Sequence, residues 1–86
     1  GADMNQQYIL QNNFGEKFRC VLSPDEDAKT QWEAIFNIHK GQGFCVEPWK
    51  DRIEIVDYFH GETRAAFKIL SVEDTDETAS DCLSKI

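Results

Sequence analysis

The stretch of sequence that decides the fold runs from Arg52 to Val72 and reads RIEIVDYFHGETRAAFKILSV. Residues 52–59 and 63–72 are rich in β-branched, aromatic and other apolar side chains, interleaved with polar ones, as in half-buried strands. Between them, His60-Gly61-Glu62 has the composition of a turn. The stretch therefore predicts a β-hairpin.

Two requirements fix the register that we expect for this hairpin. Apolar side chains should gather on one face, and opposite charges should meet on the other. A register shifted by one residue would set Ile53 opposite Lys68 and Glu54 opposite Phe67, which meets neither requirement. The register that meets both leaves an odd number of residues in the loop and pairs Ile53 with Ile69, Ile55 with Phe67, Phe59 with Thr63, and Glu54 with Lys68.

The region upstream predicts a second hairpin and a long helix. Residues 7–12 and 17–22 are expected to be strands joined by the turn sequence that starts at Asn12. Ser23-Pro24-Asp25-Glu26 matches a capping box with proline at the first helical position. A helical apolar stripe and a stop at Gly41 then predict a helix over 24–40, whose stripe consists of Ala28, Trp32, Ile35, Phe36 and His39.

Two further elements complete the expected order ββαβββα. Residues 43–47 resemble a short strand that Pro48 confines to an edge or ends. Residues 76–85 carry a cap sequence and a helical apolar repeat, so we expect a short C-terminal helix there. The class is therefore α+β: a mainly antiparallel sheet with the long helix across one face. The opening hairpin and helix are also similar to the start of a β-grasp fold, so a β-grasp-like arrangement is the alternative.

The length of 86 residues predicts a single domain. Met4 is interpreted as the natural start, so that 1–3 are an expression scar and 4–86 form the domain. The net charge of −7 argues against direct nucleic-acid binding and against an anionic membrane, and it suits a basic partner. Without a targeting or membrane-spanning stretch, the expected location is the cytoplasm.

No pattern in the sequence predicts a catalytic, metal or cofactor site. Three widely spaced cysteines, Cys20, Cys45 and Cys82, favour free thiols, with Cys20 in the core. A Cys–His–Asp triplet could be assembled from Cys45, His39 and Asp57, but no local sequence marks an activated nucleophile. Zinc-binding pairs of cysteine or histidine are missing, so we expect no enzyme, no metal and no cofactor.

Two acidic clusters allow a different function, mimicry of nucleic acid by an inhibitor. They are Asp25, Glu26 and Asp27, followed by Glu73, Asp74, Asp76 and Glu77. Each cluster lies at an expected helix N-terminus, where the helix dipole already favours negative charge. The helical interpretation therefore accounts for these acids without a target.

The candidate interaction surface is the second face of the predicted hairpin. Grouping the isoleucines on the inner face places an apolar strip outward beside positive charges, a composition typical of interface cores. An uncovered strip of this kind would be covered by a partner protein, by a second copy of the chain or by the C-terminal helix. The residues expected to carry the interaction are Val56, Tyr58, Arg64, Lys68 and Leu70.

From these features we expect a small, acidic, non-catalytic interaction domain that binds a protein partner or associates with its own copy through a sheet face. An acidic inhibitor or immunity-type protein acting on a basic target is the alternative. An enzyme with a cysteine or histidine site is the third and least favoured hypothesis.

Overall fold

The computed structural model describes residues 3–38 and 42–86. Within these ranges the chain forms a mostly antiparallel β structure with one helix, which confirms the α+β class. The elements are β1 (Asn5–Gln11), β2 (Lys17–Leu22), α1 (Ala28–Phe36), β3 (Phe44–Pro48), β4 (Arg52–Asp57), β5 (Glu62–Thr75) and β6 (Ser84–Lys85).

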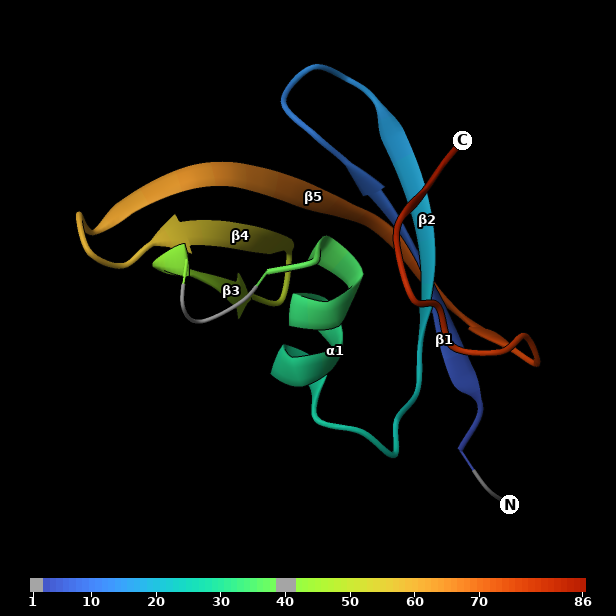
Figure 1. Ribbon diagram of the computed structural model, residues 1–86. Helices are drawn as coiled ribbons and strands as arrows, with labels where there is room; N and C mark the ends of the chain where they lie inside the picture. The colour runs from blue at the N-terminus through green and yellow to red at the C-terminus, as the bar shows by residue number, and fades with distance from the viewer. Residues whose placement is uncertain (1–2, 39–41) are drawn as a thin grey trace.

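The six strands that the structure describes form one sheet with the order β3-β4-β5-β1-β2-β6. The 14-residue strand β5 joins two halves of this sheet, because its first part pairs with β4 and its second part with β1. Lys68 marks the change, since it faces Arg52 in β4 and Gln11 in β1. Figure 1 shows β5 as a long arch over the β3–β4 hairpin that continues to the β1–β2 hairpin.

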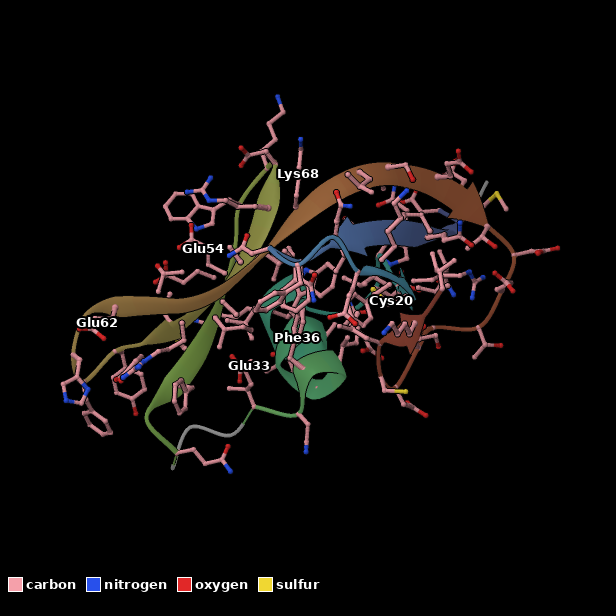
Figure 2. The ribbon with its side chains drawn as sticks, turned by 90° about the horizontal axis from the view of Figure 1, so that it is seen from above. Cys20, Glu33, Phe36, Glu54, Glu62 and Lys68 are labelled. Atoms are coloured by element: carbon pink, nitrogen blue, oxygen red, sulfur yellow. The ribbon has the colours of Figure 1, made fainter. Side chains whose placement is uncertain are left out.

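The helix α1 packs on one face of the sheet. Trp32 is 2% exposed, and its ring meets Tyr8 edge-on with the centroids 5.1 Å apart. In Figure 2, Phe36 points from α1 toward the sheet, whereas Lys68 and Glu54 lie on the opposite side, which we call the far face. Burial of the apolar residues against α1 is the main stabilising contribution. The buried core consists of Leu10, Cys20, Leu22, Trp32, Ile35, Val46 and Ile53.

The helix starts later than the capping-box pattern predicts. Asp27 is the N-cap, because its carboxylate accepts the Thr30 N–H at 3.0 Å. The buried side chain of Gln31 hydrogen-bonds the N–H and C=O of Ser23 and the C=O of Glu26, which holds this segment as a loop. The predicted cap at Ser23 was therefore wrong.

The helix also ends earlier than predicted. Asn37 is the C-cap with φ 56°, and its N–H bonds to the carbonyls of the last turn. A left-handed asparagine ends a helix as glycine does. The predicted end over 39–41 lies outside the described residues.

The predicted hairpin is confirmed, but its register was wrong. Ile53 faces Phe67 rather than Ile69, and Glu54 faces Ala66 rather than Lys68. The strand β4 ends at Asp57, and a bulge interrupts the ladder between Ile55 and Val56. Two features explain the different register. The carboxylate of Asp57 bonds to the backbone that follows it, which widens the turn. Ile69 lies opposite Leu10 in the ladder with β1, so it is not available to face Ile53.

The predicted C-terminal helix over 76–85 was also wrong. This segment runs along β2 and ends in the short strand β6, in which Lys85 faces Phe18. Ser80 binds Val21 twice, since its N–H donates to the Val21 carbonyl and its Oγ accepts the Val21 N–H, both at 2.8 Å. A helix of this length is marginal by itself, so pairing with a strand edge outcompetes it.

Candidate functional site

The best-organised polar cluster lies at the turn between β4 and β5. Asp57 is 5% exposed, and its Oδ1 accepts the N–H groups of Phe59 and His60 at 3.1 and 3.2 Å. Its Oδ2 accepts His60 Nδ1 at 2.8 Å and Arg64 Nη2 at 3.0 Å. One buried carboxylate thus fixes the backbone of the turn and the side chains of His60 and Arg64. We call the group Tyr58, Phe59, His60, Gly61 and Arg64 the β4–β5 tip.

These hydrogen bonds determine the charge state of the cluster. The bond from His60, then the bond from Arg64, lowers the pKa of Asp57 to about 2, so this carboxyl is ionised at neutral pH. An ionised carboxylate can only accept, which places a proton on His60 Nδ1. The His60 side chain is 68% exposed.

The aromatic residues of the tip are exposed but held in place. Phe59 is 71% exposed, yet its ring covers Gly43, where an added Cβ would approach the ring to 2.5 Å. Gly43 also has φ +80°, a conformation that glycine adopts without strain. Both this conformation and the close Phe59 ring therefore require glycine at position 43. Tyr58 is 48% exposed, and its ring centroid lies 4.7 Å from that of Phe59. The tip presents a fixed aromatic pair next to Arg64.

The five residues predicted to carry the interaction divide between this tip and the far face. Tyr58 lies in the turn, and Arg64 is drawn to Asp57, which shares the side of β4 that carries buried Ile53. The other three belong to the far face. Lys68 faces Arg52 there, Val56 is half-buried, and Leu70, at the bulge in the ladder with β1, is 39% exposed.

Sequence reasoning missed the residues that organise the tip. It extended the strand to Phe59, paired with Thr63, and took His60 for a simple turn residue. A signal was present, since aspartate before a turn often binds the backbone of the next two residues. The polar residue at an otherwise apolar strand position, Asp57, was the observation to follow.

The Cys–His–Asp triplet is not assembled by the residues that the structure describes. Cys45 faces Val56, so the thiol and the Asp57 carboxylate alternate to opposite faces of the sheet. His39 lies outside the described residues. His60 and Asp57 resemble the oriented base of a hydrolase, but among described residues the hydrogen-bond partner of the imidazole is Asp57 itself. No group of three or more potential metal ligands occurs in 3–38 or 42–86.

The acidic clusters are placed differently from expectation. Glu73, Asp74, Asp76 and Glu77 do not start a helix, and the first turn of α1 contains no acidic residue. The helix-dipole explanation therefore fails for all of them except the cap, Asp27. Because Gln6 faces both Leu22 and Asp74, the strands bring the two clusters to the same end of the sheet.

Comparison with known proteins gives no relative: no family model, curated protein or solved structure matches this chain. None of the described helical residues forms a segment long and apolar enough to cross a membrane. The site must therefore be interpreted from its own chemistry.

Proposed function

We propose that this chain is a small, non-catalytic interaction domain that docks on a partner protein through the β4–β5 tip. The observation that supports this proposal most strongly is the buried carboxylate of Asp57, which organises exposed aromatic and cationic side chains. Residues that dominate binding energy in protein interfaces are most often tryptophan, tyrosine and arginine in fixed positions.

Pre-organisation is the physical reason to favour the tip over the far face. A side chain already fixed in its bound conformation loses little entropy on binding, whereas each flexible one costs about 0.5–1.5 kcal/mol. The contact of Phe59 with Gly43 and the bonds of Arg64 to Asp57 and His60 to Asp57 all restrict the tip. The far face has a cluster of its own, in which Arg52 and Thr63 donate to Glu54. Among the described residues, however, no side-chain hydrogen bond holds Lys68, and Leu70 is 39% exposed.

A second protein is a better occupant of the tip than a second copy. Each copy carries a net charge of −7, so two copies repel one another at low salt. Sedimentation of the wild-type chain tests this directly, and we expect a monomer.

The test of the proposal compares two exposed phenylalanines in different turns. Phe59 lies in the tip, and Phe14, 88% exposed, lies in the β1–β2 turn. We expect a partner captured from native lysate by the wild type and by Phe14→Ala, but lost with Phe59→Ala and with Arg64→Glu. Capture of the same proteins by all four chains would contradict the proposal.

The acidic alternative has a different signature in the same experiment. An inhibitor that acts through its acidic end would lose its partner when Asp25, Glu26 and Asp76 are changed to lysine, and its binding would weaken steeply with salt. Docking through the tip predicts that these charge changes leave capture in place.

A further inference from the structure

Among the residues that the structure describes, the strand β3 has an open backbone edge. In the part of the chain that the structure describes, β4 is its only strand neighbour. Two hydrogen bonds, from Trp49 N–H to the Arg52 carbonyl and from Tyr58 N–H to the Gly43 carbonyl, show which residues bond to β4. In an antiparallel pair the backbone groups of successive residues point alternately toward and away from the partner strand. Residues 43, 45, 47 and 49 therefore bond to β4, and the residues between them point away from it. The open edge therefore carries the backbone groups of Phe44, Val46 and Pro48.

Pro48 fits this position because the N–H that it lacks would point away from β4. The edge still offers both backbone groups of Phe44 and of Val46, and the carbonyl of Pro48. Such an edge is a template for an added strand. With only five residues, β3 needs side-chain contacts as well to bind a partner strand firmly.

A groove beside this edge provides those contacts. It has a volume of about 300 Å³ and lies between β3 and α1. Its lining is mainly apolar, with the stem of Lys29 on the helix side. Facing residues in a sheet share a face, so a residue paired with Val46 would direct its side chain toward this groove. The lining residues are Lys29, Val46, Glu47, Pro48 and Trp49.

Glu47, on the face of β3 opposite to Val46, indicates which residue an added strand should carry next to the one that pairs with Val46. Glu47 directly faces Glu54 across the β3–β4 ladder. Glu54 has two donors, Arg52 Nε at 2.6 Å and Thr63 Oγ1 at 2.8 Å. Among the described residues, no cation or other donor bonds to the half-buried Glu47. Like charges opposite each other are unfavourable, and a cation on the open side of β3 would relieve them.

We infer that the β3 edge binds an extended segment of a partner protein by strand addition. An apolar residue of that segment pairs with Val46 and enters the groove, and the adjacent residue, lysine or arginine, faces Glu47. A basic segment is favoured over a second copy because the domain carries a net charge of −7. The residues involved differ from those of the tip, so this inference stands independently of the function proposed above.

The test uses the full chain and a blocked peptide of about seven alternating valines and lysines, the length of a typical strand. Amide shifts of the labelled protein should change at residues 44–47, together with the indole of Trp49. A matched peptide with glutamates in place of the lysines should bind about fivefold or more weakly. In Glu47→Lys this preference should reverse, and Phe14→Ala, in the β1–β2 turn, should leave peptide binding unchanged.

A backbone control keeps the result independent of protein folding. N-methylation of the valines removes the donors that would face β3, so the methylated peptide should not bind. The inference is overturned by equal binding of the two charged peptides, by binding of the methylated peptide, or by the absence of shifts along β3. A wild-type dimer whose β3 amides are protected from exchange would also overturn it in favour of a second copy.

Discussion

At the scale of single residues, Asp57 organises the turn between β4 and β5. One carboxylate accepts four hydrogen bonds, from two backbone N–H groups, His60 and Arg64. The sequence predicts a turn here, but not which side chain builds it. Periodicity identifies faces, whereas a hydrogen bond from a strand residue to the following turn depends on the register, and the register was mispredicted.

The ionisation of Asp57 should make part of the stability depend on pH. Its pKa is about 2 in the folded state and about 3.9 in an unfolded chain, so folding favours the ionised form. This contribution is fully present above about pH 5, is lost as the pH falls toward 2, and is missing in Asp57→Asn. Urea midpoints measured across this range should show the difference between wild type and variant shrinking on acidification. A constant difference would contradict the ionised network.

The thiols provide a second test at this scale. Burial raises the pKa of Cys20 to about 12, whereas Cys82 is exposed. The thiolate is the reactive form, so a thiol reagent at mild alkaline pH should modify Cys82 first and Cys20 only after unfolding. Mass spectrometry of peptides after timed labelling measures the order. Equal modification rates for the two thiols would contradict the burial of Cys20 in the core.

At the scale of elements, the turn between β4 and β5 depends on the contact of the Phe59 ring with Gly43. Gly43→Ala places an L-residue at a φ of +80°, which costs about 1–2 kcal/mol, and it also sets a Cβ against the Phe59 ring. Gly61→Ala, with φ +65° and no neighbour within 4 Å, should show the conformational cost alone. We expect Gly43→Ala to be the more destabilising, and Phe59→Ala to rescue part of its loss. Denaturant unfolding of the wild type, the two glycine variants and the double variant Gly43→Ala/Phe59→Ala measures these differences. Equal losses of stability in the two glycine variants would contradict the contact between Phe59 and Gly43.

The C-terminal segment should be held chiefly by Ser80. In Ser80→Ala the N–H of Val21, a residue only 2% exposed, loses its acceptor, which costs about 1–3 kcal/mol. Ser84→Ala, at an exposed position in β6, is the matched control and should change stability little. Denaturant midpoints decide, and an unaffected Ser80→Ala chain would favour the helical alternative for this segment.

Elements whose pattern is local were predictable, and those set by distant partners were not. The opening hairpin, the strand before Pro48 and the alternation in β4 follow from spacing within a few residues. The C-terminal segment carries a helical pattern too, yet Val21, about sixty residues away, provides the hydrogen bonds that decide its conformation. The predicted start of α1 was wrong for a related reason. Gln31 hydrogen-bonds Ser23 and holds as a loop the segment that the capping box was expected to make helical.

At the scale of the whole molecule, β5 couples two regions of different character. The part of β5 that pairs with β4 leads to the tip, and the part that pairs with β1 leads to the acidic end. Charge and aromatic exposure are therefore separated along one strand. The composition gives the acidic charge, whereas the interaction surface was predicted from the hairpin register. The turn at Asp57 is the reason why our proposal moves that surface to the tip.

Docking through the β4–β5 tip is tested most directly by crosslinking in the native environment. A photoreactive phenylalanine analogue replaces Phe59 in the full chain, and the same analogue replaces Phe14 as a control with similar exposure. We predict a discrete adduct with a second protein from position 59 that is missing from position 14, and that disappears when Asp57→Ala disorganises the tip. An equal pattern of adducts from both positions, or none from position 59, would contradict the proposal that this domain binds its partner through the tip.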